Sequence, residues 1–550
     1  MPRPLPDIIN ALTLTLWRAD LRGGAQAAAV ALPMGLAFGV ASGAGPVAGI
    51  YSAVCSGIFA ALFGGVPTQI SGPTGPIAIV MASVFVQFAD RPVVAFMVVV
   101  LAGLIQLGFG AARMGRYINL IPYPVTSGFA SAVGCIIIVM QINPLLGQAG
   151  VTDTWTAARA VPSSLAAMNP VTLAIGAACF VTCQWLPQRL RQIVPVHFSV
   201  LLTATVLTAT FGIDIPRITA PDTLWPTLQF TSIAELPWRD MWLAALVLAL
   251  ISSLDSLVTA ISADNATQQF HDPDRELRGQ GLGNIVAGFF GALPGSGSTF
   301  RTMANIRGGG RTPMSGVFHA LCLLALLLTA GNLIQFIPAC VLSGILMYIG
   351  LDIIDWSYIR KFPRAPRFGV FTMLVVWSIG LFVNVVTAVA IGVVMASLAF
   401  VKKMADLQLA SVKVGESRSL LSDKEQQILD RCANDVLYIS LAGPMTFGAA
   451  NGLTKRLGLV RKYRALILDF TDVPHVDESA IIALENVIER AMRNQQGVIL
   501  IGLQHAVVRA FARFGTLDLI RRCSRFRRRT AALRYAERIC TREPEESRAT

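Results

Sequence analysis

One aspartate stands within a long apolar run of the sequence. Asp255 lies inside residues 241–263, and Thr259 follows four positions later. On a helix this spacing places the carboxylate and the hydroxyl on one face. An ionised carboxylate at mid-membrane costs about 2.5–3.5 kcal/mol on insertion scales, so it is expected to have a partner or a function. We expect either ion coupling at Asp255, by a proton or by sodium held with Thr259, or a structural ion pair with Arg301.

Two turns rich in glycine and proline each precede a short apolar segment. The first is GPTGP at residues 72–76, and the second covers residues 291–299. A helix that begins at mid-membrane points free N–H groups and the positive end of its dipole at the cavity. Two such ends make an anion site, and the alternative is that each sequence is only a turn between spans. The backbone and hydroxyl groups available there belong to Thr74, Gly75, Ser298, Thr299 and Phe300.

Other residues near these turns have less specific interpretations. Arg301 could raise the potential for an anion or neutralise Asp255. Pro33 interrupts the first apolar segment, and Phe38 then forms an apolar wall of the cavity or packs as an ordinary aromatic residue. Charged residues at the segment ends are expected to be solvated or to form loop salt bridges; these are Asp264, Glu276, Arg278, Arg307 and Arg311.

The composition indicates the elements that must position these residues. Of 550 residues, 54% are hydrophobic and 14% charged, whereas soluble proteins carry about 25% charged residues. A purely soluble protein and a disordered chain are therefore excluded. Fourteen candidate spans follow from apolar stretches. They are 24–42, 46–65, 74–88, 93–112, 120–141, 171–186, 196–211, 241–263, 280–293, 299–307, 315–331, 335–350, 368–381 and 383–401.

The distribution of basic residues predicts the orientation of these spans. An even number of spans puts both chain ends on one side, and that side carries seventeen flanking basic residues against four on the other. Such a bias marks the cytoplasmic side. The nine cysteines form no CxxC motif, so neither a disulfide framework nor a zinc site is expected. The net charge of +13 is explained by orientation and by a soluble surface, and no nucleic-acid groove is indicated.

The two interrupted segments are the third of the first seven and the third of the second seven. Equivalent positions in two halves predict a 7+7 inverted repeat with the binding site at the breaks. After residue 401 the chain becomes charged, and buried strands at 435–443, 465–473 and 497–503 alternate with helical patterns at 446–459, 478–495, 505–515 and 530–540. This alternation predicts an α/β domain in which Asp477 caps a helix.

Several motifs resemble those of the SulP anion transporters, also called sulfate permeases. They lie at residues 33–38, 72–76, 253–259, 276–284 (ELRGQGLGN) and 298–305 (STFRTMAN). The segment LILDFTDVPHVDESAI is similar to the core of a STAS domain. The match is strongest to the branch of the family that transports bicarbonate with sodium.

The resemblance implies a fold and a set of roles. A core domain of segments 1–4 and 8–11 would move against a gate domain of segments 5–7 and 12–14, and the protein would be a homodimer. The implied sodium site comprises Asp255, Thr259, Gly297, Ser298 and Thr299. The anion would be held by Thr74, Gly75 and the backbone of Ser298 and Thr299.

Two departures from the family pattern bear on function. Arg301 stands where the bicarbonate branch has glycine and where many sulfate and dicarboxylate members have arginine. It could displace sodium and favour proton coupling, or favour a more highly charged anion. In the STAS loop, Ser479 matches the phosphorylated serine of the related anti-sigma-factor antagonists, but Glu478 and Ala480 depart from their pattern.

Taken together, the sequence predicts a multi-pass protein of a bacterial inner membrane with both termini in the cytoplasm. Four regions are expected, namely an N-terminal segment (1–22), a transporter domain (23–401), a linker (402–433) and a STAS domain with a basic tail (434–550). We expect a secondary active transporter of bicarbonate or sulfate that works by alternating access. No enzyme activity and no cofactor are expected beyond coupling sodium or protons.

Three alternatives remain open for the same fold. They are a passive anion channel or exchanger, a C4-dicarboxylate transporter, and a membrane sensor or scaffold that positions the STAS domain for a cytoplasmic partner.

Overall fold

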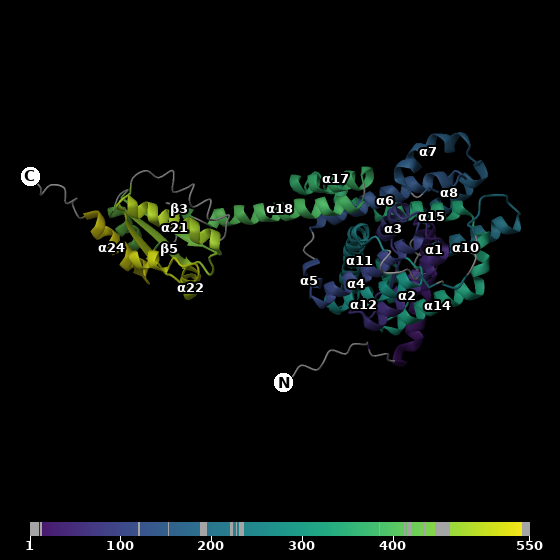
Figure 1. Cartoon of the computed structure of the whole chain (residues 1–550), viewed down its shortest axis with the longest axis horizontal. Coiled ribbons are helices and arrows are strands. Elements are labelled where there is room, and N and C mark those ends of the chain that lie inside the picture. Colours follow the sequence, from purple (N-terminus) through teal and green to yellow (C-terminus); the bar gives the residue numbers. More distant parts are fainter. Residues whose placement is uncertain are drawn as a thin grey trace, which may run out of the picture. The chain divides into compact units, whose positions relative to one another are not determined.

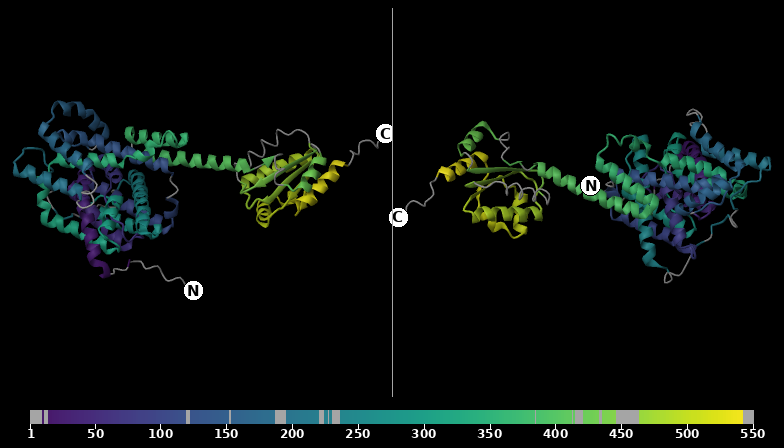
Figure 2. Two further views of the ribbon diagram at one scale, coloured as in Figure 1. Left: turned by 180° about the vertical axis from the view of Figure 1, so that it is seen from behind. Right: turned by 90° about the horizontal axis from the view of Figure 1, so that it is seen from above.

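A computed structural model (Figure 1) describes residues 10 and 14–541, apart from 119–121, 152, 187–194, 220–223, 227, 230–235, 384, 412, 415–420, 433–434 and 446–462. The chain divides into two compact units, Met1–Ala396 and Ser397–Thr550. The first is almost entirely helical and the second has a β-sheet covered by helices, as Figures 1 and 2 show.

Each predicted span overlaps one α-helix of the structure, with bounds that differ from the predicted ones. The bounds are α1 (Trp17–Ala41), α2 (Pro46–Phe63), α3 (Gly75–Gln87), α4 (Pro92–Ala111), α6 (Tyr123–Leu145), α8 (Pro170–Trp185), α10 (Val196–Thr210), α11 (Trp238–Thr267), α12 (Pro273–Phe289), α13 (Thr299–Arg307), α14 (Met314–Ala330), α15 (Ala339–Ile353), α17 (Arg367–Phe382) and α18 (Val385–Ser411). Among the described residues, seven helical stretches are long and apolar enough to cross a membrane. The prediction of a polytopic helical protein is confirmed.

The helices form two packed groups. Helices α1, α2, α4, α11, α12, α13 and α14 pack against one another, whereas α6, α8, α10, α15 and α17 form a second set. These sets correspond to core segments 1, 2, 4 and 8–11 and gate segments 5–7, 12 and 13 implied by the family resemblance, and α3 packs against helices of both sets. A further amphipathic helix, α7 (Thr154–Ala166), lies between α6 and α8 in the chain and was not predicted. Its first turn is capped by Asp153, which accepts a hydrogen bond from the backbone of Thr156.

Two very short strands join the halves of the first unit. Strand β1 (Ser71–Gly72) pairs antiparallel with β2 (Ser296–Gly297), so that Ser71 lies opposite Gly297. Helix α3 begins three residues after β1, and α13 begins two residues after β2. The breaks in the third and tenth segments therefore meet in space, as a 7+7 inverted repeat requires.

The second unit contains a five-stranded sheet in the order β3-β4-β5-β6-β7. Its strands are β3 (Lys413–Val414), β4 (Val436–Ala442), β5 (Ala465–Asp472), β6 (Gly497–Ile501) and β7 (Ser524–Phe526), of which only β3 is antiparallel to its neighbour. Alternate side chains of β4 and β5 enter two separate hydrophobic layers. The predicted α/β architecture is confirmed.

The helices of this unit cover the two faces of the sheet. Helices α19 (Asp423–Arg431) and α24 (Arg529–Thr541) pack on one face, and α21 (Glu478–Arg493), α22 (His505–Arg513) and α23 (Leu517–Arg522) pack on the other. The helix predicted at 446–459 lies outside the described residues. The short elements β3, β7, α19 and α23 were not predicted because they are too brief to give a periodic signal.

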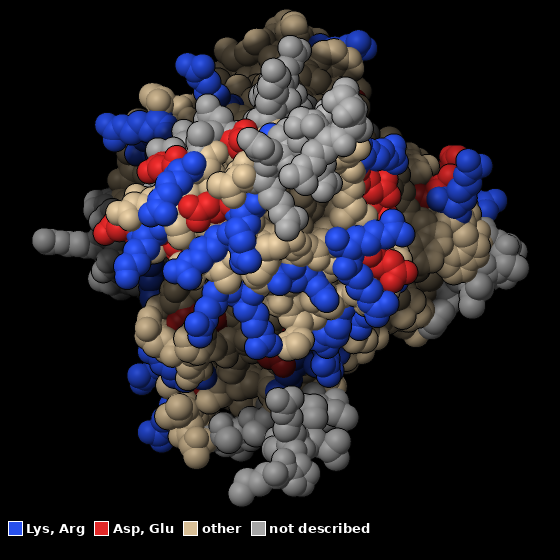
Figure 3. Space-filling view, turned by 90° about the vertical axis from the view of Figure 1, so that its left-hand side faces the viewer, with Lys and Arg blue, Asp and Glu red and all other residues tan. Residues whose placement is uncertain are grey.

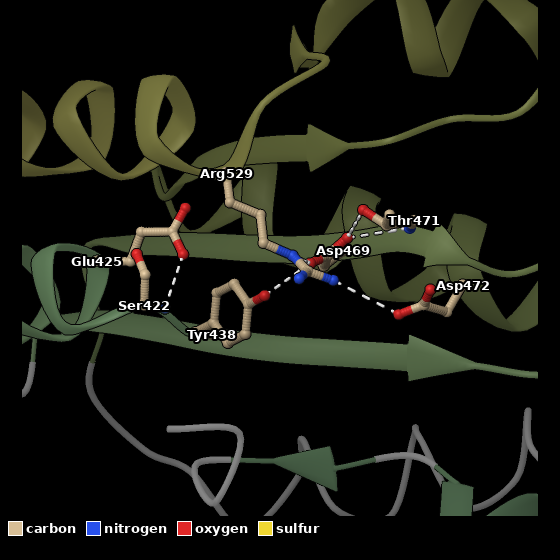
Figure 4. A network of polar contacts seen from close by, with 7 residues as sticks. All are labelled: Ser422, Glu425, Tyr438, Asp469, Thr471, Asp472 and Arg529. Carbon is tan, nitrogen blue, oxygen red and sulfur yellow. Dashed lines mark hydrogen bonds and ion pairs between the residues drawn. The ribbon is translucent and has the colours of Figure 1, made fainter. Parts of the chain in front are cut away.

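A buried polar network holds α24 to the sheet (Figure 4). Asp469, on β5, is 1% exposed and accepts hydrogen bonds from the Tyr438 hydroxyl and from Arg529 Nε, both across 2.6 Å. Burial alone would raise the pKa of Asp469, but hydrogen bonds from Thr471, Tyr438 and Arg529 outweigh it and lower that pKa. Arg529 is the first residue of α24, so the pair ties the last helix to the central strand.

Candidate functional site

Two helix N-termini beside the β1–β2 crossing lack side-chain caps. Thr74 is the N-cap of α3 and Ser298 is the N-cap of α13, yet neither side chain bonds to its own helix. The first intrahelical bonds run from Ala78 N to Thr74 O and from Thr302 N to Ser298 O. The backbone N–H groups that come before Ala78 in α3 and before Thr302 in α13 therefore have no partner within their helix. Helix N-termini of this kind bind anions well.

Asp255, on α11, faces the first of these N-termini. Its Oδ2 atom accepts a hydrogen bond from Thr74 Oγ1 across 2.8 Å and from Ser296 Oγ across 3.4 Å. Thr74 Oγ1 and Ser296 Oγ are themselves 3.2 Å apart. A carboxylate from α11 is therefore joined to both interrupted segments, because Thr74 precedes α3 and Ser296 lies on β2.

Thr259 lies one turn further along α11 and contacts the second interrupted segment. Its hydroxyl donates to Gly297 O across 3.1 Å and lies 3.1 Å from Thr299 Oγ1. The Gly297 amide donates to Ser256 Oγ across 3.0 Å, which fixes β2 against the same helix. Asp255, Thr259, Gly297 and Thr299 thus supply carboxylate, hydroxyl and carbonyl oxygens, the ligand type that hard cations prefer.

Arg301 is buried inside the helix bundle, with 1% of its surface exposed. Nη2 donates to Pro73 O across 2.7 Å, but Nε and Nη1 have no hydrogen-bond partner. Asp255 bonds instead to Thr74 and Ser296, and no ion pair joins it to Arg301. The interpretation of these two residues as a structural ion pair is therefore wrong. A buried donor without a partner costs folding free energy. Such an exception calls for an explanation, and binding of a ligand by the guanidinium supplies one.

The two phenylalanines predicted at the site, Phe38 and Phe300, differ in burial. Phe38 is 2% exposed and lies near Gly75, where an added Cβ would be 3.7 Å from its ring and would collide with Ile353 of α15. Glycine at position 75 therefore allows α3 to approach the second helix group closely. Phe300, by contrast, is 49% exposed, and Thr299 is exposed beside it.

Glu276, on α12, is a site residue that sequence reasoning missed. It was expected to be solvated, but it is 1% exposed. Its Oε1 accepts from Gln69 Nε2 across 2.7 Å and from Gln280 Nε2 across 2.9 Å, and its Oε2 accepts from the Gly65 amide across 2.9 Å. Gln280 Nε2 also donates to Ser71 Oγ. The carboxylate thereby supports β1 and the segment that leads into it.

A second buried amide supports the segment before β2. Asn284, one turn beyond Gln280, accepts from the Gly295 amide across 2.7 Å and donates to Gly295 O across 3.1 Å. It also donates to Gln106 Oε1 across 2.9 Å. The polar side of α12 thus holds both strands of the crossing. The signal in the sequence was the polar spacing of ELRGQGLGN within an otherwise apolar region.

Ser479 lies on the other unit, in the first turn of α21. The side chain is exposed, and Asp477 caps the helix by accepting from the Ala480 amide across 2.8 Å. The predicted capping role of Asp477 is confirmed. Among the described residues, no group of three His, Cys, Asp or Glu side chains could hold a metal ion.

Comparison with known proteins agrees with this geometry. Residues 17–376 match the sulfate permease family, and residues 427–531 match the STAS domain. The bicarbonate transporter BicA of Synechocystis sp. is 36% identical over 510 residues, which cover 90% of each chain. Sulfate transporter 4.1, chloroplastic, of Arabidopsis thaliana is 23% identical over 505 residues, or 84% of this chain and 71% of the relative.

Solved structures show the same fold. The transmembrane domain of a cyanobacterial BicA aligns with a TM-score of 0.64 at 36% identity and covers 71% of this chain and 99% of that one. Murine Slc26a9, an anion transporter in the inward-facing state, aligns with a TM-score of 0.81 at 17% identity and covers 95% of this chain and 91% of that one. The chain is a multi-pass membrane anion transporter rather than an enzyme, and it belongs to the sulfate permease family, with a STAS domain after its membrane part.

Proposed function

We propose that the chain is a secondary active transporter that moves a small oxyanion by alternating access and couples it to sodium or protons. The observation that carries the proposal is the meeting of two uncapped helix N-termini, the buried Arg301 and the Asp255 carboxylate at one strand crossing. N–H groups and a guanidinium bind an oxyanion through charge-assisted hydrogen bonds. A neighbouring carboxylate would repel that anion unless a cation neutralises it.

The anion that we propose first is bicarbonate. The relative that covers 90% of the chain at 36% identity is named as a bicarbonate transporter. Sulfate is the second candidate, because Arg301 adds a full positive charge to the two helix ends and a dianion gains more from it than a monoanion. The same argument applies to C4-dicarboxylates.

The coupling cation is proposed to act at Asp255. For sodium as co-substrate, the carboxylate would act with the oxygens of Thr259, Gly297 and Thr299. For a proton, Asp255 alone would suffice. Thr74 links the two events physically, because it occupies the N-cap position of the helix proposed to bind the anion and donates to the coupling carboxylate. Either cation neutralises the carboxylate charge that opposes anion binding. Binding of the cation and binding of the anion therefore favour each other, which is the basis of symport.

The orientation and assembly are proposed from the sequence. Seventeen basic residues against four place both termini in the cytoplasm of a bacterium, with the protein in its inner membrane. The transporter domain (23–401), the linker (402–433) and the STAS domain (434–550) then follow one another, and the transporter works as a homodimer. Ser479 is proposed as a regulatory position, because its side chain is exposed at the surface of the domain.

The test is uptake of radiolabelled bicarbonate, sulfate and fumarate into proteoliposomes, with sodium and pH gradients imposed separately. Asp255→Asn should abolish gradient-driven uptake. Asp264→Asn is the matched control, since Asp264 lies on the same helix and bonds to His271. Normal driven uptake by the Asp255 variant would contradict the coupling role.

The same assay separates the remaining alternatives. Uptake that persists without either gradient would indicate a passive channel or an exchanger. Anion binding without flux would indicate a sensor or scaffold. Preference for fumarate would make the protein a dicarboxylate transporter.

A further inference from the structure

The last strand and helix of the STAS domain carry a strongly basic surface. Between residues 518 and 541 the sequence has eight arginines but only two acids, Asp518 and Glu537. Seven of these arginines are exposed, and the six other than Arg521 define what we call the arginine surface: Arg522, Arg525, Arg527, Arg528, Arg534 and Arg538. Figure 3 shows basic side chains spread over much of the face that is turned to the viewer.

The nearby acids do not neutralise this surface. Asp518 pairs with Arg521 across 3.2 Å, and Glu537 pairs with Arg431 of α19 across 3.6 Å. Among the described residues, none of the six arginines forms an ion pair. Residues 542–550 carry three glutamates and two arginines, so they change the balance by only one charge.

The arrangement follows from the way α24 packs. Ala532, Leu533 and Ala536 are buried against the sheet, which turns Arg534 and Arg538 outward. The guanidinium of Arg538 lies 6.0 Å from the Tyr535 ring centroid, which supports its outward position. Arg525 lies on β7, the last strand at one edge of the sheet, Arg522 precedes this strand, and Arg527 and Arg528 lie between β7 and α24. The arginine surface is therefore built around this edge of the sheet.

We propose that the arginine surface docks on the anionic lipid headgroups of the membrane that the chain spans. Guanidinium groups bind phosphate oxygens in a bidentate geometry, and basic residues near an anionic leaflet are attracted within a Debye length. The proposal rests on the cytoplasmic orientation proposed above, in which the domain faces the leaflet that is richer in anionic lipids.

The connection between the two parts of the chain favours lipid over other polyanions. Helix α18 ends at Ser411 and the sheet begins at Lys413, so the domain cannot leave the membrane to which it is tethered. A short tether gives the headgroups a high effective concentration. The chain's own predicted cytoplasmic loops are basic and would repel the arginine surface, which excludes them as the occupant.

The test uses the full chain in lipid nanodiscs, with hydrogen exchange followed in peptides from residues 521–541. Exchange should be slower in phosphatidylglycerol discs than in phosphatidylcholine discs, and 0.5 M salt should remove the difference. The variant R522Q/R525Q/R527Q/R528Q should lose this protection. Each arginine removed is expected to lower the docked-to-free ratio by roughly fivefold at low salt. The control is R490Q/R493Q, which removes two exposed arginines from α21, on the face of the sheet opposite α24.

Three outcomes would overturn the proposal. They are equal exchange in the two lipids, an equal loss in the control variant, and protection in neutral discs on adding inorganic phosphate or RNA, which would make the surface a site for soluble polyanions. Nanodiscs hold no gradient, so this result is independent of the transport assay. Docking can therefore fail while transport stands, and transport can fail while docking stands.

Discussion

The hydroxyl of Thr74 donates a hydrogen bond to the carboxylate of Asp255 across 2.8 Å. A threonine at a helix N-cap ordinarily accepts a hydrogen bond from its own helix, but Thr74 does not. Its hydroxyl instead joins the start of α3 to the Asp255 carboxylate on α11. A change in the charge of Asp255 therefore acts through this hydrogen bond on the N-terminus of the helix that we propose binds the anion.

Replacing Thr74 with valine should weaken coupling while preserving the fold. Valine keeps the shape but removes the donor, and a hydrogen bond to a charged group contributes about 1.5–3 kcal/mol. We expect the half-saturating cation concentration of bicarbonate uptake to change roughly tenfold or more. Thr74→Ser keeps the hydroxyl and should remain close to the wild type. A valine variant with unaltered cation dependence would show that the bond is only structural.

Replacing Arg301 with alanine should reduce anion affinity and change anion preference. The guanidinium is buried with two nitrogen atoms unbonded, so its loss removes charge-assisted donors worth about 1.5–3 kcal/mol. The expected order of loss is sulfate before bicarbonate, because the dianion depends more on the charge. Arg301→Lys retains charge without the planar fork and should keep part of the affinity. Anion preference is measured by uptake of one labelled anion in competition with the others. An identical profile in the wild type and the two variants would assign Arg301 a structural role.

Replacing Glu276 with glutamine should destabilise the strand crossing. One acceptor oxygen becomes an amide that faces donors from Gln69, Gln280 or Gly65, and a buried unsatisfied group costs about 1–3 kcal/mol. The melting temperature in detergent should fall, and anion affinity should fall with it. Asp274→Asn is the control, because Asp274 lies on the same helix and also accepts a backbone hydrogen bond, from the Gly115 amide, but is only partly buried. An unchanged melting temperature for the Glu276 variant would mean that the network is dispensable.

The half-helices could be predicted from sequence, but their contacts could not. Glycine and proline at 72–76 and 291–299 interrupt apolar runs, and that local chemistry is sufficient to predict a break. The pairing of Ser71 with Gly297 involves two-residue strands, which have no periodicity to detect. Spacing along α11 placed Asp255 and Thr259 on one face correctly. It could not tell which way the neighbouring α13 turns Arg301, so the ion pair with Arg301, one of the two alternatives for Asp255, was wrong.

Glu276 shows a second limit of sequence reasoning. A carboxylate near the end of an apolar segment is solvated or buried according to what packs beside it, and Gln69 lies more than 200 residues away in the chain. In the STAS domain the buried strands were predicted because apolar runs are explicit. The network of Asp469, Tyr438 and Arg529 was not, since it joins three elements separated by up to 91 residues.

Replacing Asp469 with asparagine should destabilise the STAS domain and reduce its sensitivity to acid. Loss of one partner from a buried ion pair costs about 3–5 kcal/mol, because Arg529 and Tyr438 are left without their acceptor. Hydrogen exchange at the β5 amides of the full chain measures the loss. Asp472→Asn is the control, because Asp472 is 56% exposed and lies 3.5 Å from the same arginine, and exposed pairs contribute about 0–1 kcal/mol.

The pH dependence has a definite sign. The pKa of Asp469 is lowered in the folded domain, so its stabilising contribution is complete above the usual aspartate pKa of about 3.9. That contribution is lost as the pH falls through the lower, folded-state pKa, where the carboxylate takes up a proton. Protection of β5 should therefore decrease in acid in the wild type and in Asp472→Asn, but less in Asp469→Asn, which has no proton to gain. Equal acid sensitivity in all three proteins would mean that another carboxylate controls the acid stability of the domain.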